Sequence, residues 1–320
     1  MKALDIFAGA GGFSEGAQKA GVKVVFAVNH WDLACWTLRK NHGATKVRQE
    51  DVFEFDWNTV PDVDLVLASP ACQSHSTAAT AGLKEGRRGT APKHDRLRAT
   101  AWSVPLCLEV KRPAFCIVEN VAEFMDWAGY RAWRINIEDL GYHVAEHVVD
   151  CATFGLPSRR KRLFVSAVRD DVSPVPFDFD IPDKDPVPFG SCLTKKLTPG
   201  RERWIPFSKK TEGVQKLMLK ARKKLPRGMF LLHNSTRTRP IPLSEPCRTI
   251  TTQSGQWNVV RRGRREDEIR PFTVEEYLCA MGFPKRYKLP KNKSDCIKLI
   301  GNAVPPPVSK ELVGQIVRRG

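Results

Sequence analysis

In the first half of the chain, short and nearly continuous apolar runs alternate with segments of helical periodicity. Runs of this kind are typical of strands buried on both faces, and helices between them are typical of βαβ units. The sequence therefore predicts an α/β fold with a doubly wound, mostly parallel sheet. The expected strands are residues 3–7, 22–28, 64–68, 114–118, 144–149 and 163–168, and the expected helices are residues 13–20, 31–40 and 130–140.

Polar or glycine-rich segments follow these apolar runs directly, and parallel sheets bind ligands at the carboxyl ends of their strands. The candidate segments at this edge are residues 9–12, 29–31, 51, 70–73 and 119. Gly9-Ala10-Gly11-Gly12 follows a strand and opens a helix, so a ligand could approach the backbone closely there. Ser14 replaces the third glycine of the dinucleotide-binding pattern, and a tight strand-to-helix turn is the structural alternative.

Four side chains could carry chemistry, and two of them, Cys72 and Glu119, lie at this edge. Cys72 lies just after a strand, where a nearby helix N-terminus would lower the thiol pKa, although a small buried hydrophobe fits equally well. Glu119 ends an apolar run, where burial would raise its pKa toward the range of acid catalysis; a carboxylate satisfied by a helix N-terminus is the alternative. Arg160 and Arg162 alternate before a strand and would share one face, aimed at a phosphate or base, or at solvent.

The chain has 52 Lys and Arg against 35 Asp and Glu, a net charge of +17, and the excess is concentrated in three segments. Residues 195–240 have a net charge of +12, residues 84–98 one of +4, and residues 261–265 contain four arginines. Cations release counterions when they bind phosphates, and aromatic residues between them, such as Trp204 and Trp257, can stack on bases. A nucleic-acid partner is therefore favoured over a merely solvated basic surface.

The nine cysteines are odd in number, scattered and without a C-x-x-C pair. This argues against a disulfide framework and against a structural zinc site. Cys107 and Cys116 lie in apolar runs and are expected to be small buried hydrophobes. No apolar stretch reaches 18 residues, and the first residues run into a strand rather than a signal peptide. We expect no metal, no membrane and a reducing, cytoplasmic location.

The pattern changes after about residue 170. Residues 173–190 are rich in proline and suggest a linker, and the basic segment follows. Residues 273–281 are expected to form a helix with Thr273 as its cap, Glu276 at the capping-box position and Gly282 at its end.

A last strand is expected at residues 297–300 and a last helix at residues 307–318. We therefore predict a larger α/β domain of residues 1–180 plus 296–320 and a smaller, basic domain of residues 181–295.

Six motifs occur in an order that resembles the cytosine-5 DNA methyltransferases of prokaryotic or phage type, which depend on S-adenosylmethionine. The resemblance covers residues 3–170 and about 270–318. It implies a DNA (cytosine-5-)-methyltransferase with the S-adenosylmethionine-dependent methyltransferase fold and a smaller target-recognition domain. The motifs are Asp5-Ile6-Phe7-Ala8-Gly9-Ala10-Gly11-Gly12-Phe13, Pro70-Ala71-Cys72-Gln73, Glu119-Asn120-Val121, Phe154-Gly155-Leu156-Pro157-Ser158-Arg159-Arg160-Lys161-Arg162, Met281-Gly282-Phe283-Pro284 and Gly301-Asn302-Ala303-Val304-Pro305-Pro306.

The resemblance also implies roles for the four reactive candidates. The Cys72 thiolate would attack C6 of a cytosine that is flipped out of the duplex, and Glu119 would donate a hydrogen bond or proton to N3. Arg162, with Arg160, would hold the carbonyl edge of the base and a nearby phosphate.

The implied cofactor is S-adenosyl-L-methionine, with S-adenosyl-L-homocysteine as product. Phe7, Gly9 and Gly11 would line its methionine end. Trp31 would lie against the adenine, and Asp51 would accept from the adenine amino group. The residues expected to bind the cofactor are Phe7, Gly9, Gly11, Gly12, His30, Trp31, Asp51, Pro70 and Asn302.

The implied partner is double-stranded DNA. Residues 74–99 resemble a loop that closes over bound DNA, and residues 186–270 take the place of the target-recognition region. The resemblance further suggests a nucleoid-associated monomer in a bacterial or phage-infected cell, with a cognate restriction endonuclease as a candidate partner. The residues expected to contact DNA are Gln73, Ser76, Arg87, Arg88, Lys195, Lys196, Lys209, Lys210, Arg237, Arg239 and Gln253.

Three residues depart from the family pattern. Ala71 stands where the family usually has proline, His30 where it has a glutamate bonded to the cofactor ribose, and Ser158 where it has glutamine. These departures leave open an unusual methyl donor or a weak enzyme.

Three other functions also remain open. A dinucleotide-dependent oxidoreductase would need an acidic residue at the strand end where Asn29-His30 stands. A catalytically silent protein on this fold would bind DNA without methyl transfer. Methylation of cytosine in RNA is the third, because charge does not distinguish the two polymers.

Overall fold

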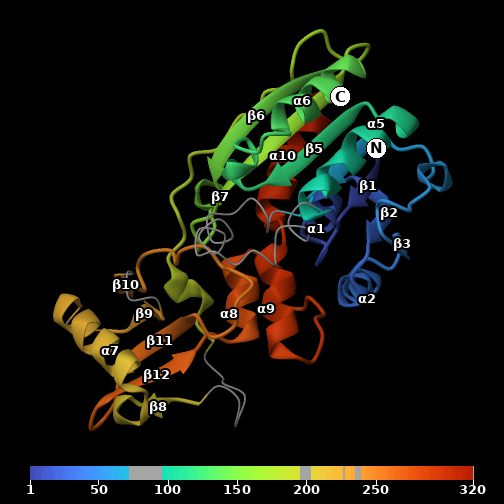
Figure 1. Ribbon diagram of the computed structural model, residues 1–320. Helices are drawn as coiled ribbons and strands as arrows, with labels where there is room; N and C mark the ends of the chain where they lie inside the picture. Colours follow the sequence, from blue (N-terminus) through green and yellow to red (C-terminus); the bar gives the residue numbers. More distant parts are fainter. Residues whose placement is uncertain (72–95, 195–202, 226–227, 235–238, 320) are drawn as a thin grey trace. The chain divides into compact units, whose positions relative to one another are not determined.

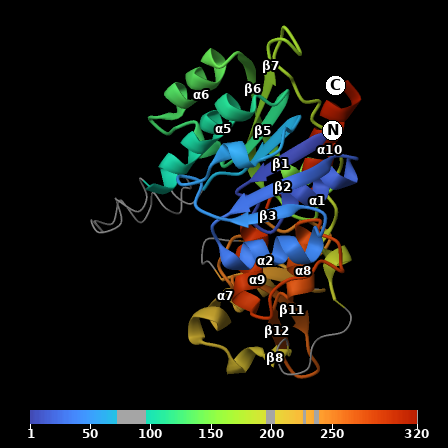
Figure 2. The same ribbon diagram turned by 90° about the vertical axis from the view of Figure 1, so that its right-hand side faces the viewer.

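The apolar runs of the first half pair into one seven-stranded sheet, in the order β3-β2-β1-β4-β5-β7-β6 (Figure 1). Strands β1 to β5 are parallel, and β7 runs antiparallel to both β5 and β6. Figure 2 shows β3, β2 and β1 side by side. The prediction of a mostly parallel sheet is confirmed. The strands are β1 (Lys2–Ile6), β2 (Lys23–Asn29), β3 (Lys46–Gln49), β4 (Leu65–Ala68), β5 (Phe115–Asn120), β6 (Tyr142–Asp150) and β7 (Lys161–Arg169).

The computed structural model describes residues 1–71, 96–194, 203–225, 228–234 and 239–319, which divide into two compact units. The first unit comprises Met1–Cys151, Lys161–Pro182 and Ala303–Gly320, and the second comprises Ala152–Arg160 and Asp183–Asn302. Residues 152–160 and 296–302 thus fall in the second unit, whereas the sequence grouped them with the larger domain. Ser158 shows why: its Oγ donates to the Ala280 carbonyl at 2.6 Å, inside the second unit.

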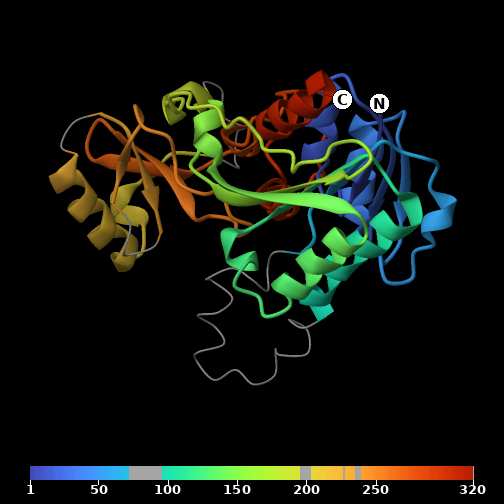
Figure 3. The same cartoon turned by 90° about the horizontal axis from the view of Figure 1, so that it is seen from above.

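Helices cover both faces of the seven-stranded sheet. Seen from above (Figure 3), the red helix α10 lies on one side of the sheet and the green helices α5 and α6 lie on the other. The helices of the first unit are α1 (Gly12–Lys19), α2 (Asp32–Asn41), α5 (Ser103–Lys111), α6 (Tyr130–Asp139) and α10 (Pro306–Arg319), with short 3₁₀ helices η1 (Trp57–Thr59), η3 (Thr100–Trp102) and η4 (Ala122–Phe124).

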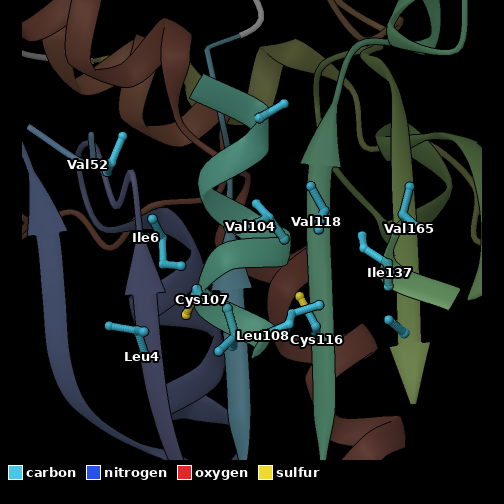
Figure 4. Close-up of a cluster of buried hydrophobic side chains, with 14 of the residues drawn as sticks. Leu4, Ile6, Val52, Val104, Cys107, Leu108, Cys116, Val118, Ile137 and Val165 are labelled. Atoms are coloured by element: carbon cyan, nitrogen blue, oxygen red, sulfur yellow. The ribbon is translucent and has the colours of Figure 1, made fainter. Parts of the chain in front are cut away.

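The core on the α5 and α6 side is apolar. Figure 4 shows Leu4 of β1, Val118 of β5 and Val104 of α5 among its side chains. Burial raises the pKa of the thiols of Cys107 and Cys116, which lie in this cluster. Both are therefore small apolar core residues, as the sequence predicted.

On the other face, α10 and the residues just before it pack so closely on α1 that glycines are required in α1. A Cβ on Gly12 would lie 1.9 Å from the carbonyl oxygen of Val304, and one on Gly16 would lie 2.4 Å from the Cβ of Ser309. The Ser309 hydroxyl also donates to the Phe13 carbonyl at 2.8 Å. Val304, in the last sequence motif, thus needs a glycine at position 12 for packing alone.

The second unit has its own antiparallel sheet of five short strands, in the order β10-β9-β11-β12-β8. Helix α7 (Glu212–Lys224) covers it, because Met218 and Ala221 pack against Phe230, Val260 and Ile269. The strands are β8 (Ile205–Pro206), β9 (Phe230–His233), β10 (Ile241–Pro242), β11 (Trp257–Arg262) and β12 (Asp267–Pro271), with 3₁₀ helices η5 (Cys151–Phe154, at the junction of the units), η6 (Phe189–Cys192) and η7 (Phe207–Lys209).

Helix α8 (Val274–Ala280) begins as the sequence predicted. The Thr273 side chain accepts from the Glu276 N–H, and the Glu276 carboxylate accepts from the Thr273 N–H, at 3.1 and 2.9 Å. The same carboxylate forms a buried ion pair with Arg270 at 2.6 Å. The capping box therefore also fixes the end of β12 to the helix.

The strand predicted at residues 297–300 is wrong, because these residues lie within helix α9 (Lys293–Asn302). Cys296, Ile297, Leu299 and Ile300 are buried there. This spacing is that of one face of a helix and not of a strand.

Cys192 of η6 and Cys279 of α8 form a disulfide, which corrects the expectation drawn from the cysteine pattern. The two residues are 87 positions apart, so their spacing carries no local signal, and the fold of the second unit brings them together. Within the described ranges, no helix is both long and apolar enough to cross a membrane.

Candidate active site

Glu119 and Arg162 meet at the carboxyl edge of the seven-stranded sheet. Glu119 lies near the end of β5, and β7 begins at the same edge because it is antiparallel, with Leu163 opposite Asn120. The Arg162 Nε lies 3.0 Å from the Glu119 Oε1, and the two side chains are 12% and 5% exposed. The structure thus brings together two of the residues that the sequence assigned to chemistry.

The pair is buried but its hydrogen-bonding capacity is not used up. Each charge compensates the other, which lowers the cost of burial. Neither the Glu119 Oε1 nor the Arg162 Nε makes a well-aligned hydrogen bond to any residue that the structure describes. A polar ligand at this edge could therefore be bound by both groups.

The residues before Cys72 are anchored next to this pair. The Asn120 side chain donates to the Pro70 carbonyl at 3.3 Å, and its oxygen accepts from the Val121 N–H at 2.8 Å. The Ala71 N–H donates to the Thr100 hydroxyl at 3.3 Å. Pro70 and Ala71 are thus fixed to the end of β5 and to η3; Cys72 itself lies outside the described residues.

The glycine turn after β1 has an unusual backbone. Phe7, Gly9 and Gly11 have positive φ angles of 59°, 52° and 82°, and the Gly11 N–H donates to the Ala8 carbonyl at 2.7 Å. A Cβ on Gly9 would meet only the Phe7 carbonyl, at 3.7 Å, among the described atoms within 4 Å. The backbone at Gly9 is therefore open to a ligand, whereas the absence of a side chain at Gly12 is explained by Val304.

Asp5 lies beneath this turn as a fully buried carboxyl group. Burial raises its pKa to about 7, against the opposing effect of the Ser14 hydroxyl, which donates to its Oδ2 at 2.5 Å. The Oδ1 accepts no hydrogen bond from any residue in the described part of the chain. Asp5 had no predicted role of its own, and its place before the glycine turn is the one sequence feature that could have suggested one.

The ends of β2 and β3 carry the remaining cofactor candidates of the first unit. His30 is exposed and Trp31 is half-buried, with the Trp31 N–H donating to the Asn29 side chain at 2.9 Å. The Asp51 carboxylate pairs with Arg96 at 3.1 Å. All three side chains lie at the same edge as the glycine turn, because β1, β2 and β3 are parallel.

Arg160 and Arg162 do not share a strand face, contrary to expectation. Strand β7 starts at Lys161, and Arg160 is buried in the second unit with its Nη1 donating to the Ile250 carbonyl at 3.1 Å. Asn302 also belongs to the second unit, as the last residue of α9. Their expected contacts with base, phosphate and cofactor stay predictions.

Four of the expected DNA contacts are described, all in the second unit. Lys209 and Gln253 are exposed, Lys210 is half-buried, and Arg239 is exposed and paired with Glu245 at 3.0 Å. Gln253 also accepts a hydrogen bond from Gln256. The other expected contacts lie outside the described residues, and they are Gln73, Ser76, Arg87, Arg88, Lys195, Lys196 and Arg237.

Two further residues of the site, Asn120 and Thr100, had no predicted role there. Asn120 was quoted within a motif but given no task, and it is the residue that anchors Pro70. Thr100 carried no signal, because it is 29 positions from its partner Ala71.

The sequence of the whole chain is similar to those of a known protein family. The family described as C-5 cytosine-specific DNA methylase matches residues 1–318. The chain is 25% identical to the Type II methyltransferase M.MthTI of Methanothermobacter thermautotrophicus, over 99% of this chain and 97% of that protein. It is 28% identical to the Type II methyltransferase M.NgoBI of Neisseria gonorrhoeae, over 96% and 90%.

The fold has a similar counterpart among solved structures. The S. pombe Dnmt2 methyltransferase matches with a TM-score of 0.70 and 16% identity, over 99% of this chain and 98% of that chain. With the family match spanning both units, the chain belongs to the C-5 cytosine-specific DNA methylase family, and it is a DNA cytosine-5 methyltransferase with the S-adenosylmethionine-dependent methyltransferase fold.

Proposed function

We propose that this enzyme methylates a cytosine within a short, specific sequence of double-stranded DNA, with Cys72 as a covalent nucleophile and S-adenosyl-L-methionine as the methyl donor. The observation that supports this most strongly is the buried Glu119–Arg162 pair, at the sheet edge where Pro70 and Ala71 are anchored. Cys72 follows Ala71 directly in the sequence.

The chemistry needs a nucleophile because C5 of cytosine is a weakly nucleophilic carbon in an aromatic ring. The Cys72 thiolate forms a bond from its Sγ to C6, and the electrons of the C5–C6 double bond shift toward C4 and N3. Glu119, once its carboxylate has taken up a proton from solvent, stabilises them by donating a hydrogen bond or that proton to N3, which leaves C5 as the nucleophilic carbon of an enamine. After methylation, loss of the C5 proton to a base and cleavage of the Sγ–C6 bond restore the ring.

The target atoms are inaccessible in a stacked base pair, so the cytosine has to leave the duplex. Arg162 keeps Glu119 in position through the 3.0 Å contact and presents a cation to the carbonyl edge of the flipped base. Because the pair is almost fully buried, its interactions with the base act with little competition from water.

The strand ends of the first unit suit the proposed cofactor. The open backbone at Gly9, the half-buried Trp31 and the Asp51 carboxylate offer a close approach, an aromatic face and an acceptor. Phe7, Gly11, His30, Pro70 and Asn302 remain further candidates for this site. When bound, S-adenosylmethionine supplies the electrophilic methyl group that C5 accepts, and S-adenosylhomocysteine is released.

The DNA is proposed to contact the second unit through Lys209, Lys210, Arg239 and Gln253. Amide side chains such as that of Gln253 can read base edges, while the lysines and the arginine neutralise phosphates. Relatives of this chain are named Type II methyltransferases, so we propose a modification enzyme that acts as a monomer beside a restriction endonuclease of the same specificity.

Bisulfite sequencing tests the activity. Mixed-sequence duplex DNA is incubated with the purified protein and S-adenosylmethionine, and cytosines protected in one short context are expected. An equal incubation with RNA identifies the polymer. Full conversion of every cytosine, by a protein that binds the DNA, would contradict the proposed function.

A duplex with 5-fluorocytosine at the target position tests the covalent step. Fluorine leaves C5 without a proton to lose, so the Sγ–C6 bond should persist and add the mass of the DNA strand to the protein. The Cys72→Ala protein should form no adduct and transfer no methyl group, while it still binds DNA. Methyl transfer by Cys72→Ala would exclude the mechanism.

A further inference from the structure

The turn between β11 and β12 carries Arg261, Arg262, Arg264 and Arg265, and the function proposed above gives these residues no task. We propose that this arginine hairpin, residues 261–268, is a phosphate-binding surface that holds the DNA backbone outside the recognised sequence. The inference rests on the proposed action on double-stranded DNA and adds a contact surface to it. Figure 1 shows the hairpin beside β8, with which β12 pairs.

The charge of the hairpin is not neutralised by its own acidic residues. Glu266 accepts from the backbone N–H and the hydroxyl of Ser208, both at 2.8 Å. Asp267 lies opposite Arg262 in the ladder, but its carboxylate pairs with Arg222 at 2.7 Å. Glu268 pairs with Arg261 at 2.8 Å. Each acid is therefore occupied by a partner other than the three arginines nearest the tip.

Those three arginines are available for a ligand. Arg262, Arg264 and Arg265 are exposed. No ion pair links any of them to an acidic side chain within the described ranges. Three uncompensated guanidinium groups within four sequence positions form a strongly basic surface that attracts anionic ligands. The paired N–H donors of a guanidinium match the spacing of phosphate oxygens.

The hairpin is held in shape without a ligand. The Arg261 guanidinium lies 4.1 Å from the centre of the Trp204 ring, and that of Arg270 lies 5.1 Å from the same ring. The Gly263 N–H donates to the Glu266 carbonyl at 3.0 Å, and a Cβ on Gly263 would lie only 2.3 Å from that oxygen. Because the backbone of the tip is already ordered, binding costs less conformational entropy.

The surface also has a hollow. A cavity of about 740 Å³ is lined by Pro206, residues 261–265, Glu266 and Glu268. Lys209, one of the expected DNA contacts, is exposed and follows Ser208, whose hydroxyl is bonded to Glu266 of the hairpin. The hairpin therefore extends a basic surface that the sequence had assigned to DNA. Arginines that bind phosphates fix the protein on the duplex and carry no base specificity.

The test compares the salt dependence of DNA binding in the full-length protein. The variant Arg262→Gln, Arg264→Gln, Arg265→Gln removes three charges. Its matched control is Lys2→Gln, Lys23→Gln, Lys40→Gln, which removes three exposed lysines of the first unit. Lys2 and Lys23 lie at the amino ends of β1 and β2, away from the carboxyl edge of the sheet.

Each phosphate contact contributes about 0.9 to the slope of log Kd against the logarithm of the salt concentration. The variant in which Gln replaces the three arginines, called the arginine variant, should therefore lose about 2.7 from that slope, and the lysine control should lose almost none. Single Gln variants should each lose about 0.9, which keeps the test valid if the triple variant does not fold. The Lys-for-Arg triple variant should recover most of the slope. On a duplex that only spans the recognised sequence, the arginine variant and the wild type should bind alike.

The results separate this inference from the proposed function. A wild-type protein that methylates DNA, with an arginine variant of unchanged slope, would overturn the hairpin surface alone. A wild-type protein that neither binds nor methylates duplex DNA would overturn both proposals. An equal loss of slope in the lysine control would show a general effect of net charge and would also exclude the hairpin surface.

Discussion

The Arg162 guanidinium lies 3.0 Å from the Glu119 carboxylate because strand β7 runs antiparallel to β5. In an all-parallel sheet, the start of β7 would lie at the opposite edge from the end of β5. Because β7 is reversed relative to β5, a cation at the start of β7 lies beside a carboxylate near the end of β5. Both belong to the first unit, so the pair exists without any contribution from the second.

Arg162→Ala should abolish methyl transfer and also destabilise the protein. Removing one partner of a buried ion pair leaves an uncompensated charge, which typically costs about 3 kcal/mol. The double variant with Glu119→Gln should regain most of this free energy of unfolding and none of the activity. Denaturant unfolding and methyl-transfer assays measure the two effects separately. If Arg162→Ala were as stable as the wild type, the ion pair would contribute nothing to the free energy of unfolding.

Asn120→Ala should lower kcat by about 10- to 100-fold, since a small displacement of a reacting group has effects of this size. The substitution removes the donor to the Pro70 carbonyl and the acceptor for the Val121 N–H. Asn120→Asp keeps the acceptor only and should have an intermediate kcat. Asn58→Ala, an exposed asparagine in η1, is the matched control and should retain the wild-type kcat. Equal kcat values for Asn120→Ala and Asn58→Ala would show that Pro70 needs no such anchor.

Gly12→Ala should lower the free energy of unfolding by about 3 kcal/mol or more, because its Cβ would collide with the Val304 carbonyl oxygen. Gly43→Ala is the control, since no atom lies within 4 Å of its added Cβ, and it should be neutral or slightly stabilising. Urea unfolding without cofactor measures both. A Gly12→Ala protein of normal stability and weak cofactor affinity would assign this glycine to the ligand and not to packing.

Relative to Asp5→Asn, the wild type should lose stability between pH 5.5 and 7.5. Burial raises the pKa of Asp5 to about 7, from 3.8 as its ordinary value. Between these values the folded protein holds a proton that the unfolded chain has released, so its stability falls as pH rises and levels off about one unit above the pKa of the folded carboxyl. The loss over this window is about 2 kcal/mol relative to Asp5→Asn. Unfolding curves of both proteins at pH 5.5 and 7.5 give the difference, and parallel pH profiles would refute it.

The parallel strands could be predicted because their residues are apolar without interruption, as in Leu65–Ala68. The edge strand Lys46–Gln49 lacked this signal, since most of its side chains are exposed. Helix α5 contains Pro105 and is apolar on nearly all sides, so it shows no amphipathic period. Four apolar-rich residues at 297–300 were too short a window to reveal a helix that begins at Lys293.

A site residue could be predicted where its position next to an apolar run indicates the edge of the sheet, as for Glu119 at the end of a strand. Its pairing with Arg162 required the direction of β7, which no local pattern contains. Arg160 was grouped with Arg162 by strand alternation, but the strand begins between them and Arg160 bonds to Ile250 instead. The contacts of Thr100 and Ser309 link distant segments and depend on the complete fold.

The ribosome makes Ser309, whose hydroxyl donates to the Phe13 carbonyl, 296 positions after Phe13. Until then the face of α1 that carries Gly12 and Gly16 has no helix against it. The nascent chain therefore carries an incomplete first unit until the segment from Ala303 onward has been made. The first unit therefore completes the packing around α1 only after α10 has left the ribosome.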